Sequence, residues 1–261
     1  MILEDFHVHT SYCDGNNSAE EMVRAAIELN MTRIGFSVHS YTAFDQSYCI
    51  KKERIAEYQA EIRGLAQKYS GKIKVLCGVE LDYYSDMTAQ EFDYAIGSVH
   101  YIKTGEGYTE IDISSEMLTD AAEKYYGGDL VALAEVYFAD MGDALRKTGA
   151  DIIGHFDLVT KFNQDKKLFD TDDPRYVAAA KRAIDRLLPY GKPFEINTGA
   201  ISRGYRNEAY PQEWQLRYIA ENGGKVILSS DSHSADTLCY RFEEYERLAK
   251  DLGFKDFKLK I

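Results

Sequence analysis

Strand-like apolar runs alternate with helical segments along almost the whole chain, and this alternation limits the folds that the chain can adopt. Seven such runs are present, nearly all followed by a segment of helical periodicity, and no repeat or linker interrupts them. Strands that alternate with helices form a parallel sheet, because each crossover must return along one face. Seven or eight such units in about 250 residues close naturally into a barrel. The sequence therefore predicts an α/β fold of the TIM-like barrel type.

The expected elements follow from apolar periodicity and from cap residues. The expected strands span residues 5–10, 33–39, 74–81, 94–100, 151–155, 193–197 and 225–233. The expected helices span residues 19–30, 51–69, 116–126, 130–147, 174–188, 211–221 and 235–252. The stretch 101–128 is predicted to be a long loop with a short helical piece, the kind of segment that often covers an active site. A doubly wound open sheet is the second choice, but no Gly-x-Gly-x-x-Gly follows the first strand.

His7 and His9 stand at alternate positions of the first expected strand. Alternate side chains of a strand point to the same side, so the two imidazoles form half of a tetrahedral metal site. A surface strand with two polar residues is the other interpretation of an isolated His-x-His. The remaining histidines favour the metal site, because each stands where an apolar run meets a turn: His39, His100, His155 and His233.

In a barrel of this type, the C-terminal ends of the strands meet at one rim, where the active site lies. The residues expected at this rim are His7, His9, His39, Glu80, His100, His155, Asp231 and His233, and Asp14 lies in the adjacent loop. One four- or five-coordinate metal cannot use so many ligands, so they predict a multinuclear site. Nine residues suffice for three metals if one carboxylate bridges. Any single histidine of the set could instead be an ordinary core residue.

Five short motifs carry a resemblance to a known family. They are Asp5-x-His7-x-His9-Thr10 with Asp14-Gly15, Gly78-x-Glu80-x-Asp82, Gly97-Ser98-Val99-His100, Gly154-His155-x-Asp157 and Ser230-Asp231-Ser232-His233. In this order they resemble the successive motifs of the polymerase and histidinol phosphatase (PHP) family, and within it the stand-alone L-histidinol phosphate phosphatases. The resemblance implies a distorted seven-stranded (β/α)7 barrel with a trinuclear metal centre.

The resemblance also implies how the ligands are shared. One metal is assigned to His7, His9, Glu80 and Asp231. A second, bridged by Glu80, is assigned to His100 and His155, and the third to Asp14, His39 and His233. Histidine and carboxylate ligands suit zinc, manganese, iron and cobalt, so the identity of the three divalent ions stays open.

A metal centre of this kind predicts phosphate ester hydrolysis. Two metals can clamp a bridging hydroxide and orient a phosphate for in-line attack. The phosphate also needs cationic donors; Arg203, in a loop flanked by glycines, is the first candidate, with Lys161 and Arg206 next. Each could instead be a solvated surface charge. Asp231, His233 or a metal-bound water could protonate the leaving group, and the sequence does not choose among them.

Composition limits the classes of partner that the protein is expected to bind. The 261 residues carry a net charge of −12, which disfavours nucleic acid and anionic membrane surfaces as partners. Four scattered cysteines and the absence of a signal-peptide pattern favour a reducing cytoplasm. We expect one PHP phosphoesterase domain over residues 1–261, with no prediction of its oligomeric state.

The predicted function is hydrolysis of L-histidinol phosphate to L-histidinol and phosphate, in histidine biosynthesis, because that is what the resemblance implies. Two alternatives are kept. One is a phosphoesterase of the same family that acts on nucleotides or DNA ends. The other is a catalytically inert module that binds metals for structure only, which the open coordination positions of a shared trinuclear site disfavour.

Overall fold

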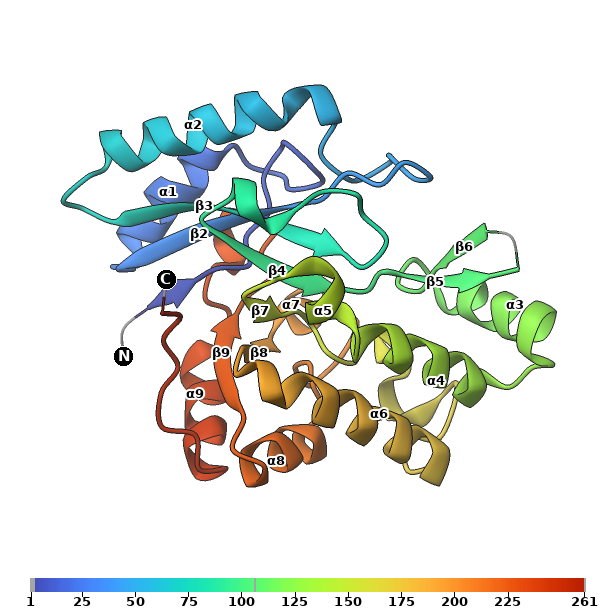
Figure 1. The fold of residues 1–261 in the computed structure, drawn as a ribbon. Coiled ribbons are helices and arrows are strands. Elements are labelled where there is room, and N and C mark those ends of the chain that lie inside the picture. Colours follow the sequence, from blue (N-terminus) through green and yellow to red (C-terminus); the bar gives the residue numbers. More distant parts are fainter. Residues whose placement is uncertain (1–2, 106, 261) are drawn as a thin grey trace.

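Seven parallel strands form one sheet in the computed structural model, which describes residues 3–105 and 107–260 (Figure 1). The strand order is β1-β2-β3-β4-β7-β8-β9, and all paired neighbours run parallel. The bounds are β1 (Glu4–Asp5), β2 (Arg33–His39), β3 (Lys74–Asp82), β4 (Tyr94–Ser98), β7 (Ile152–Ile153), β8 (Pro193–Asn197) and β9 (Lys225–Ser229). The predicted α/β architecture is confirmed.

Contact between the first and last strands closes the sheet into a barrel. Val8 makes a parallel bridge to Ser232, with hydrogen bonds from His9 N to Ser232 O (2.8 Å) and from Ser232 N to His7 O (3.1 Å). These residues lie beyond the regular ends of β1 and β9, so the seam is short and irregular. The barrel is therefore seven-stranded and distorted, as expected.

Helices cover the outside of the barrel. The helices are α1 (Ala19–Glu28), α2 (Ile55–Lys68), α3 (Ser115–Tyr126), α4 (Leu130–Met141), α5 (Ala144–Thr148), α6 (Pro174–Leu187), α7 (Gly199–Ser202), α8 (Glu213–Glu221) and α9 (Phe242–Asp251). α1 and α2 lie over one side, and α4, α6, α8 and α9 over the other (Figure 1). Among the described residues, no helix has both the length and the apolar character that a bilayer crossing requires.

Several expected elements differ in the structure. The strands expected at 5–10, 151–155 and 225–233 are shorter, at Glu4–Asp5, Ile152–Ile153 and Lys225–Ser229. The stretch predicted as a loop contains the antiparallel hairpin of β5 (Tyr101–Thr104) and β6 (Gly107–Glu110) before α3. The predicted helix 130–147 breaks after α4, where Gly142 packs against the backbone of Ala183 too closely for a side chain. The predicted helix 235–252 begins only at Phe242, because Arg241 adopts a left-handed conformation (φ 54°).

Apolar side chains fill the barrel interior at the N-terminal ends of the strands. This lower cluster consists of Phe6, Leu76, Tyr94, Ile96, Ile152, Ile227 and Leu259. Two glycines make room for its largest ring: a Cβ on Gly78 would lie 2.3 Å from Cζ of Tyr94, and one on Gly35 would lie 2.5 Å from its hydroxyl oxygen. The lower interior is thus a packed core, which leaves the other end of the strands for polar groups.

Candidate metal centre and active site

Nine histidine and carboxylate side chains meet at the C-terminal end of the barrel. His39 ends β2, Glu80 lies near the end of β3, and the others follow strand ends or lie in the adjacent loop. Their ligand atoms form overlapping groups in which all atoms lie within 4.8 Å of one another. The groups include every residue that the sequence selected as a ligand: His7, His9, Asp14, His39, Glu80, His100, His155, Asp231 and His233.

Glu80 lies at the centre of this cluster and is fully buried. Its Oε2 lies 3.1 Å from His7 Nε2, 3.6 Å from His9 Nε2 and 2.9 Å from His39 Nδ1. Its Oε1 lies 3.2 Å from His100 Nε2 and 2.8 Å from His155 Nε2. One carboxylate thus faces five imidazoles, with each oxygen directed at a different set. That is the position that a bridging ligand would need.

Asp14 is a second carboxylate that contacts several histidines, and its side chain is more exposed than that of Glu80. Its oxygens lie 3.6 Å from His39 Nε2 and 3.2 Å from His233 Nε2. The His9 ring stacks against the ring of His39 and against the ring of His233, with centroid distances of 4.3 and 4.1 Å. Asp14 is therefore more than the surface Asp-Gly turn that its local sequence also suggests.

Unsatisfied polar atoms are concentrated here. Buried polar groups are normally hydrogen-bonded. Within residues 3–105 and 107–260, nine buried side-chain nitrogen or oxygen atoms have no hydrogen-bond partner, and five of them belong to this cluster: His7 Nε2, His9 Nε2, His39 Nδ1, Glu80 Oε2 and His155 Nδ1. Imidazole nitrogens and carboxylate oxygens are ligands of divalent transition metals. The donor set therefore fits metal ions.

The charge balance points the same way. Burial alone would lower the pKa of His7, but Glu195, Glu80 and Asp231 hold it well above its usual range. Burial alone would raise the pKa of Glu80, but His7, His39 and His100 keep it well below its usual range. The carboxylates are thus ionised and attract positive charge, which protons or metal ions can supply. His9 differs, because burial and the neighbouring His233 and His39 lower its pKa to about 3.

Two further carboxylates orient the histidines, and the sequence analysis gave neither a role. Glu195 Oε1 accepts a hydrogen bond from His7 Nδ1 (2.8 Å), which leaves Nε2 directed at Glu80. Asp82 Oδ2 lies 3.3 Å from His100 Nδ1 and accepts from the His100 backbone N–H (2.9 Å). Such partners fix the tautomer and the ring orientation of metal-binding histidines.

The three candidate phosphate donors lie in different environments. Arg203 follows α7, and its Nη1 donates to Asp231 O (2.7 Å) while Nη2 lies 3.1 Å from Asp231 Oδ2. Arg203 and Lys161 both line a pocket over the cluster, which is described below. The Lys161 Nζ, however, donates to Asp112 O and Oδ2 (2.7 and 3.2 Å). Arg206 is buried, donates to Thr160 Oγ1, and does not line the pocket. The geometry favours Arg203.

A pocket of about 290 Å³ lies over the cluster. Arg203 and six residues of the cluster line it, together with two carboxylates, Glu110 and Asp112, and two aromatic rings, Tyr48 and Tyr205. Burial and the neighbours Asp112 and Asp45 raise the pKa of Glu110 to about 7. The pocket therefore offers a guanidinium, carboxylates and aromatic rings to one ligand.

Comparison with known proteins identifies the family of the chain. The family model described as the PHP domain matches residues 5–199. A Deinococcus radiodurans protein named a probable histidinol-phosphatase is 30% identical over 265 residues, covering 96% of this chain and 94% of that protein. The family model covers the first four of the five motifs and ends before Asp231 and His233.

Solved structures share the fold. A candidate histidinol phosphatase, hisK, from Listeria monocytogenes superimposes with a TM-score of 0.78 at 23% identity, covering 93% of this chain and 99% of that chain. The histidinol phosphate phosphatase of Lactococcus lactis, in complex with zinc, L-histidinol and phosphate, gives a TM-score of 0.68 at 20% identity, covering 97% and 94%. The chain belongs to the PHP domain family.

Proposed function

We propose that the protein is a metal-dependent phosphatase that hydrolyses L-histidinol phosphate to L-histidinol and phosphate, a step of histidine biosynthesis. The observation that carries the proposal is the cluster of nine ligand-type side chains, six of which line the same pocket as Arg203. The named relatives support the substrate: the Deinococcus radiodurans protein is named a probable histidinol-phosphatase, and the Lactococcus lactis structure holds zinc, L-histidinol and phosphate.

Three divalent ions are proposed for the cluster. His7, His9, Glu80 and Asp231 would hold the first, and Glu80, His100 and His155 the second. Asp14, His39 and His233 would hold the third. The donors suit zinc, manganese, iron or cobalt. Bound there, the ions would supply Lewis-acid stabilisation of the phosphoryl oxygens and a nucleophile at neutral pH.

Residues of the chain itself would orient the ester. The Arg203 guanidinium donates one hydrogen bond to the carbonyl and one to the carboxylate of Asp231. The same pair of donors matches two phosphate oxygens. A donor placed where charge develops stabilises the transition state. Asp231 and His233 remain the proposed proton carriers for the leaving alkoxide. Lys161 would act more weakly, because Asp112 already holds its ammonium group.

The acidic side of the pocket would receive the cationic end of the substrate. L-Histidinol phosphate carries an ammonium group and an imidazole. Glu110 has no ion-pair partner among the described residues, whereas Asp112 is paired with Lys161. Because its carboxylate lies near two other acids, an incoming ammonium group would relieve the repulsion. Glu110 is therefore our choice for headgroup recognition.

A comparison of kcat/KM across phosphate monoesters tests this function. We expect metal-loaded protein to prefer L-histidinol phosphate over p-nitrophenyl phosphate and a nucleoside monophosphate by at least about tenfold, or 1.4 kcal/mol. Glu110→Gln should reduce this preference while p-nitrophenyl phosphate turnover persists. Release of mononucleotides from an oligonucleotide at a comparable rate would support the nucleotide alternative. No hydrolysis of any ester by loaded protein would support the inert module.

A further inference from the structure

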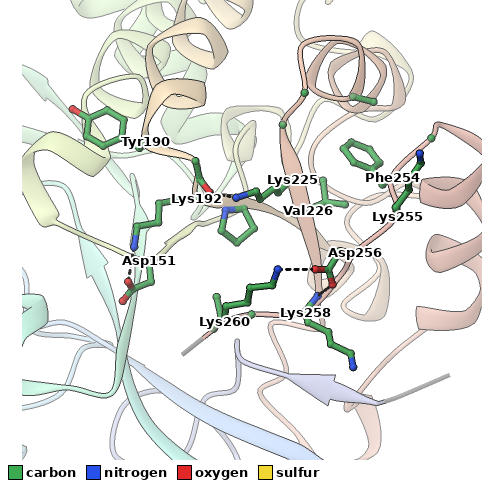
Figure 2. A pocket seen from close by; sticks show the side chains of 17 residues that line it. Asp151, Tyr190, Lys192, Lys225, Val226, Phe254, Lys255, Asp256, Lys258 and Lys260 are labelled. Atoms are coloured by element: carbon green, nitrogen blue, oxygen red, sulfur yellow. Dashed lines mark hydrogen bonds and ion pairs between the residues drawn. The ribbon is translucent and has the colours of Figure 1, made fainter.

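A second cavity, of about 480 Å³, opens at the opposite end of the barrel from the metal centre (Figure 2). Its lining includes Asp151, just before β7, and the first residues of β8 and β9. In a parallel barrel these strand starts lie at the end away from the catalytic rim. The segment 253–260, which follows α9, forms another wall. The residues of this basal cavity take no part in the proposed phosphatase site.

Positive charge is concentrated in the basal cavity. Two aspartates, Asp151 and Asp256, face five lysines: Lys192, Lys225, Lys255, Lys258 and Lys260. The whole chain shows the opposite balance, with 43 acidic and 31 basic residues. A local excess of three positive charges on an acidic protein creates a field that attracts anions.

The two aspartates neutralise only two of the lysines. Lys192 Nζ lies 2.8 Å from Asp151 Oδ1, and Lys260 Nζ lies 3.2 Å from Asp256 Oδ2. Lys225 Nζ donates to the neutral carbonyl of Gly191 (3.0 Å). In the described part of the chain, no carboxylate pairs with Lys225, Lys255 or Lys258. Three ammonium groups of the cavity lining therefore have no carboxylate partner among the described residues.

The remaining walls are apolar and aromatic. Val226, Phe254 and Leu259 are buried side chains of the lining, and Tyr190 exposes 47% of its surface. Figure 2 shows the Tyr190 ring on one side of the cavity and the Phe254 ring on another. The volume lies within the range of sites for small organic ligands, about 300–1,000 Å³. An organic anion with a planar ring would use both kinds of wall.

We propose that the basal cavity binds a nucleoside polyphosphate, with the phosphates at Lys225, Lys255 and Lys258 and the planar base against the aromatic walls. Ammonium groups form charge-assisted hydrogen bonds with phosphate oxygens. Three such groups match the several charges of a polyphosphate better than the single charge of a carboxylate. This binding is independent of the proposed phosphatase reaction.

The ligand would also contact the segment that closes the lower end of the barrel. Leu259 packs into the lower cluster beside Phe6, and Arg33 Nη2 donates to Leu259 O (2.9 Å). Lys255 and Lys258 lie in the same segment, which has no helix or strand of its own. Occupation of the basal cavity should therefore slow backbone hydrogen exchange in residues 253–260.

Calorimetric titration of the holoenzyme tests the proposal, with ATP as the probe and saturating inorganic phosphate present to occupy the catalytic pocket. We expect ATP to bind, and Lys225→Glu and Lys258→Glu each to weaken its affinity at least tenfold. Lys124→Glu, on α3 and outside the cavity lining, is the matched control and should bind ATP normally. These exposed lysines are no part of the catalytic machinery, so turnover should stay unchanged in all three variants.

Two results would overturn the proposal. One is no ATP binding by the native protein up to about 1 mM. The other is equal ATP affinity in the native protein, Lys225→Glu and Lys258→Glu, which would place the ligand elsewhere. Inorganic triphosphate distinguishes the source of affinity: it should bind more weakly than ATP. Equal affinity would refute the role assigned to the aromatic walls.

Discussion

The two ends of the barrel interior differ in how far their buried polar groups are hydrogen-bonded. In the lower cluster, seven apolar or aromatic side chains pack together, and the one polar group, the Tyr94 hydroxyl, donates to Phe6 O at 2.6 Å. At the upper end, five buried nitrogen or oxygen atoms have no hydrogen-bond partner within the described part of the chain. An unpaired buried polar atom costs about 1–3 kcal/mol. The lower end therefore stabilises the fold, and the upper end is built for ligands at the expense of stability.

The same strands contribute side chains to both ends of the interior. The packed lower end therefore holds in place the upper end, whose unpaired polar atoms destabilise the fold. Phe6 lies in the lower cluster, and the next residue, His7, lies in the candidate metal centre. Along β4 and its extension, Ile96 lies in the lower cluster and His100 in the candidate metal centre. Substitutions at the upper end should therefore change activity and metal content, whereas substitutions at the lower end should change stability alone.

Glu80→Gln should have the largest effect. The substitution keeps the shape of the side chain but removes the charge that faces five imidazoles. We expect kcat/KM to fall by more than about 10³, beyond the usual loss of one transition-state donor, and the bound metal measured by mass spectrometry to fall with it. Full metal content with near-normal turnover would contradict the central role of Glu80.

Arg203→Ala should rank next. Loss of a donor to the phosphoryl group should lower kcat/KM by about 10²–10³, or 2.7–4 kcal/mol, and Arg203→Lys should recover only part of the loss. Arg203 also contacts Asp231 and His233, so metal content must be measured alongside. If turnover falls only in proportion to lost metal, Arg203 positions ligands and does not bind phosphate.

Glu195→Gln should have a smaller effect through His7. Both oxygens of Glu195 accept hydrogen bonds, Oε1 from His7 Nδ1 and Oε2 from the His155 backbone N–H (3.0 Å). A glutamine places its NH₂ group against one of these donors. We expect metal affinity or activity to fall about 10–100-fold, with part of the activity restored by added metal. Exposed Glu213→Gln is the control; an equal loss there would remove the argument.

Sequence reasoning located the cluster at the upper end but missed the residues that support it. The positions of the candidate ligands follow from two simple rules, the two-residue period of strands and the common rim of a parallel barrel, and these rules bring His7, His9 and Glu80 to one place. Glu195 was missed because no rule gives a buried partner to a particular histidine. Its signal was local: a charged residue in the middle of the strand Pro193–Asn197.

Side-chain direction outside regular structure was the second limit. Arg203 and Arg206 are three residues apart, yet one faces the pocket and the other lies buried beside Thr160. The short helix α7 and the turn after it decide this, and a glycine-containing loop has too many accessible conformations for the sequence to choose one. The β5–β6 hairpin was missed for a similar reason, because its strands have four residues each.

Tyr94→Phe should have the smallest effect and tests the lower end. The change keeps the ring that fills the space above Gly35 and Gly78 but removes the hydroxyl, which donates its one proton to Phe6 O (2.6 Å) with Phe36 O nearby at 3.1 Å. Loss of this hydrogen bond costs about 0.5–1.5 kcal/mol, and Tm should fall by about 2–4 °C per kcal/mol, as measured by calorimetry.

Metal content and kcat/KM of Tyr94→Phe should equal those of the native protein, since its hydroxyl contacts only backbone carbonyls. Tyr240→Phe, at a ring that is 37% exposed, is the matched control and should leave Tm unchanged. A Tyr94→Phe variant that lost metal or turnover at unchanged Tm would show that the two ends of the interior are coupled. In that case the lower cluster would position β1, and with it His7, in addition to stabilising the fold.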